Sequence, residues 1–373
     1  MSAFLQQFDL STHDRADAPT IAIKDSIDIA GYATTAASRA LADAAPAQKH
    51  AVVVQRLLDA GWRITGKTNM HELAFGMTGI NDYCGTPVNP QDDARIPGGS
   101  SSGSASAVGL GLVDAALGTD TGGSVRGPAA CCGVIGFKPT FGRVSREGVA
   151  PGFTTLDCVG PFARDMNTII AVMEAIDPAF QGVKANARIG LVRVEADREI
   201  SEAVERVVPS SPSIELASMK EAFNAGLAII NAETWRAFGH LFDSGKLGAD
   251  IAVRLKAASN TNDADLEAAE RVRRTFTHEV DCALEHVDVL VMPTLPALPI
   301  TIEAARAGTS VIAMSSLIRP FNLSGHPALT LPVPIAHSRI KAGLQIIGRK
   351  GEDEIVCAAA KQIEGILREM ENV

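Results

Sequence analysis

Three segments of the chain combine residue types and spacings that support chemistry, and the first of them matches a phosphate-binding loop. Residues 61–68 read GWRITGKT, which fits the pattern GxxxxGK[ST] at every fixed position. That pattern binds phosphate when a strand leads into a glycine-rich loop and a helix follows directly. Here helical periodicity precedes the first glycine, and Trp62, Arg63 and Ile64 are bulky residues typical of a strand. We therefore expect no nucleotide binding at this segment.

The second segment, residues 99–103 (GSSSG), fits the GxSxG pattern with Ser101 as a serine nucleophile. A nucleophile elbow follows an apolar strand, and the preceding residues 92–98 (DDARIPG) do not form one. The later histidines, one of which would have to act as the base, lie in ordinary helical or loop contexts: His240, His278, His286, His326 and His337. This pattern does not favour a Ser-His-Asp hydrolase.

The third constellation joins Lys24 to residues 98–105 (GGSSSGSA) and residues 118–130 (GTDTGGSVRGPAA). A lysine kept neutral by burial can act as a base, and a second serine can relay the proton from a nucleophilic serine. In residues 121–124 (TGGS), successive N–H groups next to Ser124 could form an oxyanion hole. The competing interpretation is a glycine-rich turn with a capping serine and a buried, ion-paired lysine. The residues alone leave both open.

The elements around these residues alternate between strands and helices. Residues 19–29 have the alternation of a strand pair or a strand-turn with Lys24 near its middle, and residues 49–60 have helical periodicity. A short strand follows at 62–67, and residues 69–75 begin another helix. The region from about 177 to 280 is charged and helical, and residues 352–371 form a closing amphipathic helix. This order predicts an α/β fold.

Composition limits the function classes. The chain has 373 residues, of which 46% are hydrophobic and 21% charged, so it can bury a large core. Its net charge of −9 and the lack of a basic block argue against nucleic acid or an anionic membrane surface as a partner. No apolar run reaches the roughly 18 residues of a membrane span, and no signal peptide is evident. We expect a cytoplasmic protein that binds a small molecule, and its scattered cysteines predict no metal site.

Taken together, these motifs resemble the amidase signature family of serine hydrolases, which use a Ser-cisSer-Lys triad. The agreement runs over most of the chain and is carried by the following stretches: AIKDSIDIAG, GKTNMHELAFG, PGGSSSGSA, LGTDTGGSVRGPAACCGVIGFKPTFGRVS, LDCVGPFARD, DVLVMPTLP and RPFNLSGHPALTLPVP. The resemblance implies a single amidase domain over residues 1–373. Its expected core is a large, mixed, twisted β-sheet with helices on both faces.

The resemblance also implies roles for individual residues. Ser124 would be the nucleophile, Ser100 the relay serine behind a cis Gly99–Ser100 peptide, and Lys24 the base. The backbone N–H groups of Thr121, Gly122, Gly123 and Ser124 would form the oxyanion hole. Asp120 and Arg126 would form a structural ion pair that braces this loop, and substrate recognition by Arg126 is the alternative.

The activity implied is an amidase that hydrolyses a small carboxamide to an acid and ammonia or an amine, through an acyl-enzyme and without a cofactor or metal. Substrate-binding candidates are the residues where relatives line the acyl pocket: Ala74, Phe75, Gly76 and Met77. Two alternatives remain, a non-catalytic partner subunit on the same fold and the glutaminase-type subunit of a transamidation complex. That glutaminase branch places an acidic residue shortly before the position of Asn322, and residues 313–319 (AMSSLIR) contain none.

The sequence departs from the family at two places. Only 23 residues precede Lys24, where relatives carry a longer leader, and the helical segment at about 177–280 is short. We therefore expect a smaller or more open acyl pocket. The oligomeric state is left open by the sequence, with a homodimer as the simplest expectation.

Overall fold

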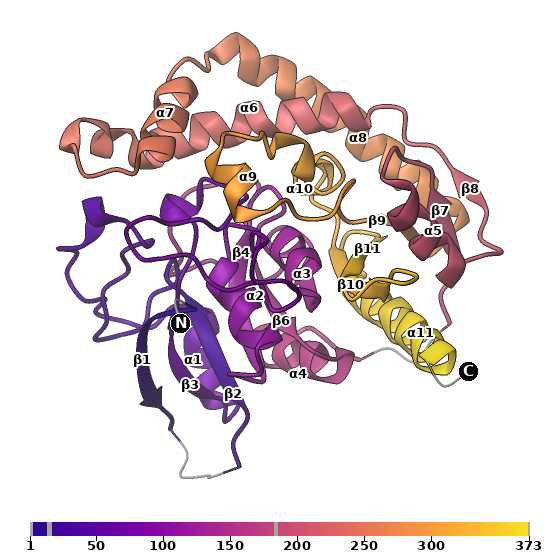
Figure 1. Cartoon of the computed structure of the whole chain (residues 1–373), viewed down its shortest axis with the longest axis horizontal. Coiled ribbons are helices and arrows are strands. Elements are labelled where there is room, and N and C mark those ends of the chain that lie inside the picture. Colours follow the sequence, from indigo (N-terminus) through magenta and orange to yellow (C-terminus); the bar gives the residue numbers. More distant parts are fainter. Residues whose placement is uncertain (1–2, 13–16, 183–185, 372–373) are drawn as a thin grey trace.

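The computed structural model describes residues 3–12, 17–182 and 186–371. The strands of this part of the chain are β1 (Phe4–Leu10), β2 (Thr20–Lys24), β3 (Arg63–Thr68), β4 (Ala115–Asp120), β5 (Ile135–Lys138), β6 (Cys158–Ala163), β7 (Ile189–Val192), β8 (Ser213–Ile214), β9 (Val289–Pro293), β10 (Ala328–Pro334) and β11 (Lys341–Gly348). They form a sheet in the order β1-β3-β2-β4-β6-β5-β10-β11-β9-β7-β8. Along this order the sheet begins with strands from the N-terminal part of the chain, continues with β10 and β11 from the C-terminal part, and ends with β7 and β8 from the middle of the chain (Figure 1).

The α-helices of the described residues are α1 (Val52–Asp59), α2 (Ser102–Gly109), α3 (Arg126–Cys132), α4 (Met166–Ile176), α5 (Arg198–Val207), α6 (Met219–Phe238), α7 (Ala249–Ala258), α8 (Asp263–His286), α9 (Ile302–Arg306), α10 (Pro320–Leu323) and α11 (Asp353–Glu371). Short 3-10 helices occur at η1 (Arg39–Leu41), η2 (Glu72–Ala74), η3 (Gly239–Ser244) and η4 (Ile312–Ser315).

The sheet is mixed, because its two outer parts contain parallel pairs and its middle is antiparallel. Strands β3, β2 and β4 run parallel to one another, as do β9, β7 and β8. Between them, β4, β6, β5, β10, β11 and β9 pair antiparallel in turn. The predicted α/β class with a large mixed sheet is therefore confirmed.

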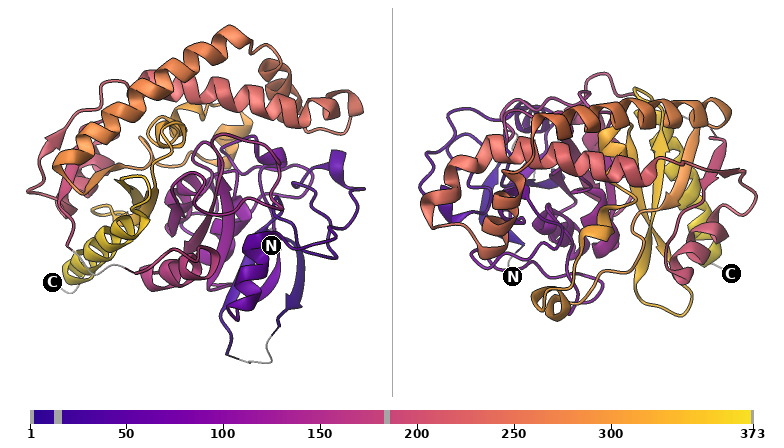
Figure 2. Two further views of the ribbon diagram at one scale, coloured as in Figure 1. Left: turned by 180° about the vertical axis from the view of Figure 1, so that it is seen from behind. Right: turned by 90° about the horizontal axis from the view of Figure 1, so that it is seen from above.

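Alternation along the strands places helices on both faces of the sheet. In β2, Ile21 and Ile23 pack into a core cluster that includes α1, α4, α5 and α11, whereas Ala22 packs against α2 and α3. In β9, Val291 joins the first cluster, while Leu290 packs towards α6 and α8. Figure 2 shows α6 and α8 side by side along the outside of the molecule. Period-two burial of this kind is what a sheet covered on both faces requires.

Helix α8 begins with a capping box, in which two residues of the first turn bond to each other. The N–H of Asp265 donates to the Asn262 side chain at 3.0 Å, and the N–H of Asn262 donates to the Asp265 carboxylate at 3.0 Å. This capping box satisfies two N–H groups that the first turn leaves unpaired. None of the helices in the described ranges is both long and apolar enough to cross a membrane.

One expectation about local structure was wrong. Residues 69–75 do not begin a helix beyond the three-residue η2, because Leu73 and Ala74 have φ values of 52° and 56°. The N–H of His71 donates instead to the carbonyl of Ser100 at 2.9 Å. By contrast, the predicted strand-turn around Lys24 is present: Lys24 ends β2, and a turn follows at residues 25–26.

Candidate active site

The candidate site lies where two parallel strands end. Strands β2 and β4 are neighbours and run parallel, so their carboxyl ends meet at the same edge of the sheet. Lys24 ends β2, and Asp120 ends β4 directly before the TGGS turn. In sheets with parallel strands, ligands usually bind at the carboxyl ends of the strands.

Lys24 is fully buried and contacts hydroxyl groups of the predicted site. Its Nζ donates to Ser100 Oγ at 2.7 Å and to Thr119 Oγ1 at 2.8 Å. Burial lowers the pKa of Lys24 from 10.5 to about 7, although the charges of Asp157 and Asp120 act to raise it. A large fraction of this amine is therefore neutral near pH 7 and able to accept a proton.

Ser100 lies at the start of the serine-rich segment that leads into α2. Its peptide bond to Gly99 is cis, as the family resemblance implied, and its side chain is completely buried. The neighbouring Ser101 is also buried, and its hydroxyl is hydrogen-bonded to the backbone of Thr119 (3.3 Å to the carbonyl). The Ser101 hydroxyl is thus bonded to backbone and not to a histidine, as a serine nucleophile of a GxSxG motif would be.

Ser124 follows the two glycines after β4 and is 6% exposed. The N–H of Ser101 donates to the Ser124 carbonyl at 3.3 Å, which brings the segment of Ser100 and Ser101 against that of Ser124. The turn is held by Asp120, whose carboxylate accepts the N–H groups of Gly123 at 2.8 Å and Val125 at 3.1 Å. Of the four N–H groups expected in the oxyanion hole, that of Gly123 is therefore already engaged with Asp120.

Arg126 completes a fully buried network around this turn. All five of its N–H groups donate within the protein: to Asp120 Oδ1 and Oδ2, the Ile318 carbonyl, Gln345 Oε1 and Asn322 Oδ1. Burial acts to raise the pKa of Asp120, but the Arg126 charge and the hydrogen bonds from Arg126 and Asn322 outweigh it and hold that pKa well below its usual value. No N–H of Arg126 is left for a substrate, which contradicts the alternative of substrate recognition by this residue.

Two of the four substrate-binding candidates contact the residue before Ser100, and the other two pack elsewhere. Gly76 and Met77 pass over Gly99, where a Cβ built on Gly99 would lie 2.6 Å from the Gly76 carbonyl. Ala74 and Phe75 pack instead against an apolar cluster that includes Leu73 and Leu241. All four are half-buried. Gly76 and Met77 thus lie against the peptide that leads into Ser100, whereas Ala74 and Phe75 belong to the apolar cluster.

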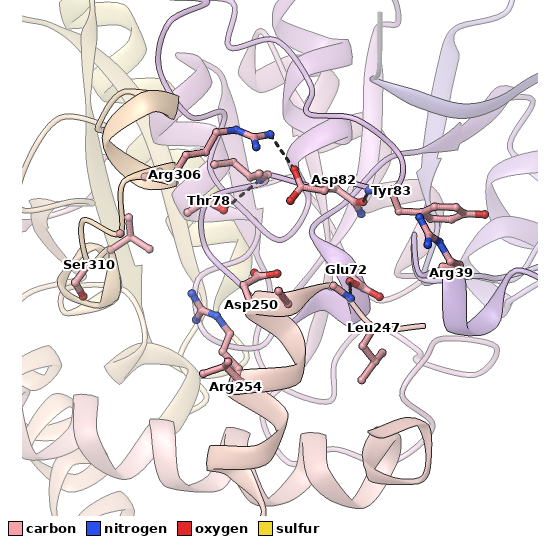
Figure 3. Close-up of a pocket in the computed structure, with 18 of the residues that line it drawn as sticks. Arg39, Glu72, Thr78, Asp82, Tyr83, Leu247, Asp250, Arg254, Arg306 and Ser310 are labelled. Carbon is pink, nitrogen blue, oxygen red and sulfur yellow. Dashed lines mark hydrogen bonds and ion pairs between the residues drawn. The ribbon is translucent and has the colours of Figure 1, made fainter. Parts of the chain in front are cut away.

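A cavity of about 900 Å³ opens beside this segment (Figure 3). It is lined by Glu72 and Thr78 on one side and by Asp250 and Arg254 of α7 on another. Its lining does not include Lys24, Ser100 or Ser124, but Thr78 is hydrogen-bonded to His71, whose backbone N–H reaches the Ser100 carbonyl. The cavity and the buried site are therefore neighbours.

Two residues near Lys24 were missed from the sequence. Thr119 supplies the second hydroxyl at Lys24 Nζ, and Asp157 is a buried acid whose charge acts on the same amine. Asp157 is itself bonded to Thr121 Oγ1 at 2.9 Å and paired with Arg146 at 2.9 Å. Both lie inside stretches that carry the resemblance, GTDTGGS and LDCVGP, so motif position was the available signal.

The phosphate-loop pattern has no phosphate-binding geometry. Residues Arg63–Thr68 are the strand β3, and Lys67 Nζ pairs with Asp25 at 2.9 Å and donates to the Ala33 carbonyl at 2.8 Å. Its charge is thus committed to a structural contact. Across the described ranges, no group of three or more His, Cys, Asp or Glu side chains is arranged to hold a metal ion.

Comparison with known proteins is consistent with this geometry. The Amidase family model matches residues 20–207 and 184–357. A curated relative, a Glutamyl-tRNA(Gln) amidotransferase subunit from Methanospirillum hungatei, is 32% identical over 92% of this chain and 92% of its own length. A solved amidase structure superposes with a TM-score of 0.83 at 30% identity, covering 94% of this chain and 84% of that one. The solved structure of the corresponding amidotransferase subunit from Thermotoga maritima superposes with a TM-score of 0.82 at 28% identity, covering 97% and 86%.

Proposed function

Because the chain belongs to the amidase signature family, we propose that it is an amidase that hydrolyses a small carboxamide through an acyl-enzyme on Ser124. The observation that carries this proposal is the contact of 2.7 Å between the buried amine of Lys24 and the hydroxyl of Ser100. Burial gives Lys24 a pKa of about 7. A base with a pKa near the working pH is suited to proton transfer in both directions.

In the proposed reaction, Ser124 Oγ attacks the amide carbonyl carbon while its proton passes to Ser100 Oγ and the Ser100 proton passes to Lys24 Nζ. The N–H groups of Thr121, Gly122 and Ser124 are the proposed donors to the oxyanion, since Gly123 is held by Asp120. The Lys24 ammonium then returns a proton through Ser100 to the leaving nitrogen, and the C–N bond breaks. Water attacks the acyl-enzyme by the same relay, which releases the acid and restores Ser124.

Returning a proton to nitrogen matters because an amide anion is a very poor leaving group. One relay that serves both the nucleophile and the leaving nitrogen solves this problem without a cofactor. We propose that the cavity beside Thr78 is the route by which the amide reaches the buried serines, with Gly76 and Met77 at its inner end. A single domain and a cytoplasmic location stay predictions.

A glutaminase subunit of a transamidation complex is the second candidate. It is favoured by relatives that are subunits of Glutamyl-tRNA(Gln) amidotransferases and are 30–33% identical over about nine-tenths of this chain. That function would bring protein partners with it. Against it, residues 313–319 contain no acid to hold the amino group of glutamine, and the charged residue in that segment is the cation Arg319.

The test compares wild type, Ser124→Ala and Lys24→Ala on benzamide, indoleacetamide, malonamide, biuret and glutamine, with ammonia release as the readout. We expect release by wild type and a loss in both variants on the order of 10²-fold or more. A fluorophosphonate probe should label wild type and Ser101→Ala but not Ser124→Ala. Hydrolysis of glutamine without hydrolysis of glutaramate, which has the same amide and carboxylate but no amino group, would favour the second candidate. No release combined with no labelling of Ser124 would overturn both.

A further inference from the structure

Arg319 is a buried cation beside the candidate site whose charge is left without an acid. It is 6% exposed and lies directly before α10. In the described part of the chain, no carboxylate pairs with it, and its Nη2 donates to Ser315 Oγ at 2.7 Å. Its Nε and Nη1 atoms are buried without a partner. Of five N–H donors, therefore, one is used.

The contrast with Arg126 shows that this arrangement is unusual within the same molecule. Arg126 is also buried, but all five of its N–H groups donate and it pairs with Asp120 at 2.9 Å. Burying an unpaired guanidinium costs several kcal/mol, so native proteins rarely do it without a ligand or a function. Arg126 thus has all its donors bonded within the protein, whereas Arg319 has most of its donors free.

The surroundings of Arg319 are built to hold it. The ring of Phe223 on α6 lies 4.3 Å beneath the guanidinium. Gly226, one turn later on the same helix, leaves space for the side chain, because a Cβ there would lie 3.0 Å from Arg319 Cγ and 3.1 Å from Cδ. A glycine inside a helix costs about 0.5–1 kcal/mol relative to alanine. Helix α6 therefore gives up stability at the position where Arg319 passes.

The guanidinium faces the turn that carries the nucleophile. A Cβ built on Gly122 would lie 3.5 Å from Arg319 Nε, and one built on Gly123 would collide with Ile318, the residue before Arg319. Burial and the charge of Arg254 lower the pKa of Arg319 to about 10, so the group stays protonated at neutral pH. A positively charged group with free N–H donors therefore lies against Gly122, which is two residues before Ser124 in the chain.

From this geometry we propose that Arg319 binds a carboxylate carried by the substrate, so that the enzyme acts on short amides that bear a carboxylate, such as monoamides of small dicarboxylic acids. The inference rests on the proposed amidase function and specifies its substrate class. Guanidinium groups bind carboxylates through charge-assisted hydrogen bonds, and the lack of a competing acid leaves Arg319 available for one. Neutral amides of the same length lack the group that would pair with it.

Binding can be tested without catalysis in the Ser124→Ala variant. Calorimetric titration with oxamate, malonamate, succinamate and glutaramate is compared with neutral amides of the same length, such as butyramide for succinamate. We expect at least one carboxylated amide to bind tenfold or more tightly than its neutral counterpart. Adding Arg319→Gln should abolish this preference and Arg319→Lys should keep part of it. Acetate, which has no amide, separates general anion binding from recognition of the substrate.

Arg236→Gln is the matched control, because Arg236 on α6 also stacks over a phenylalanine, Phe153, but is exposed. It should keep the preference for the carboxylated amide. No preference in Ser124→Ala, a preference that survives Arg319→Gln, or an equally strong effect of Arg236→Gln would each overturn the inference.

Stability gives a second, independent measurement. An arginine held for a ligand should destabilise the empty protein, so Arg319→Gln is expected to raise the midpoint of thermal unfolding, and a saturating carboxylated amide should raise that of wild type but not of Arg319→Gln. A merely structural arginine would give a lower midpoint on substitution. If wild type hydrolyses neutral amides but shows no preference, the amidase proposal stands and this inference fails. If wild type hydrolyses nothing, the amidase proposal fails, and the binding comparison still decides the role of Arg319.

Discussion

At the scale of single residues, Lys24 is fully buried, and its amine is contacted by uncharged hydroxyls. The hydroxyls of Ser100 and Thr119 accept its N–H groups, while the acids that attract its charge, Asp157 and Asp120, are hydrogen-bonded to other partners. Burial therefore dominates, and its pKa falls to about 7. In the proposed reaction, this amine takes a proton from Ser100 and returns it.

This pKa predicts how activity depends on pH. Only the neutral amine accepts a proton, so kcat/KM for an amide without ionisable groups should rise with pH through an apparent pKa near 7 and level off above about pH 8. Initial rates across a buffer series, with protein integrity checked by circular dichroism at each pH, measure this. A flat profile, or a fall in kcat/KM as pH rises through 7, would contradict Lys24 as the base.

The Asp120–Arg126 pair predicts a large loss of stability on substitution. Asp120→Asn leaves Arg126 buried without its counter-charge, so the free energy of unfolding should fall by about 3–5 kcal/mol. Urea unfolding at pH 7 is the measurement. Asp288→Asn is the control, because Asp288 pairs with Arg188, which is largely exposed, and should lose less than ~1 kcal/mol. Similar losses in both variants would show that the buried pair does not brace the turn.

At the scale of elements, a buried histidine joins helix α8 to the strands β10 and β11. His326 lies two residues before β10, and its Nε2 is 2.9 Å from Asp281 of α8, which also pairs with Lys350 just after β11. Burial, with the Lys350 charge, lowers the pKa of His326 to about 4, although Asp281 acts to raise it. His326 is therefore neutral where an unfolded histidine would be half protonated.

This contact predicts acid sensitivity. Since the folded pKa lies below the unfolded value of 6.5, the unfolded chain binds more protons as pH falls from about 7 towards 4, and stability is lost over that window. Between pH 7 and 5 this histidine should account for about 2 kcal/mol of the loss in unfolding free energy. His326→Gln should have a flatter pH dependence in urea unfolding, while substitution of the exposed His240 should not. An unchanged slope in His326→Gln would contradict the assignment.

Local sequence patterns predicted elements well where burial alternated and poorly where the site shapes the backbone. The strand at Lys24, the helix after residue 49 and the closing helix are confirmed. The expected helix from residue 69 fails because Leu73 and Ala74 adopt left-handed conformations and His71 donates its N–H to Ser100. Periodicity reports which residues face a core, and it does not report a backbone turned towards a distant serine.

At the scale of the whole molecule, the sequence indicated an α/β fold, and the family resemblance added a mixed sheet but not its strand order. The pairing of β5 with β10 joins segments about 190 residues apart in the chain, and no local pattern encodes it. The residues of the candidate site also differ in how far local motifs could identify them. Motifs predicted Lys24, Ser100 and Ser124, and the structure brings Lys24 and Ser100 into contact. Arg319 stayed unrecognised, because an arginine with free donors differs from a paired one only through its surroundings.

The network around Arg126 determines when, during synthesis on the ribosome, the turn that carries Ser124 can make all its contacts. Arg126 donates to Asn322 and to Gln345, which lie 196 and 219 residues later in the chain. At about 5–20 residues per second, the ribosome needs on the order of 10–40 s to synthesise the stretch from Arg126 to Gln345. Until then the turn that carries Ser124 lacks these two bonds. We expect the candidate site to stay incomplete on the nascent chain until the residues up to Gln345 have emerged from the ribosome.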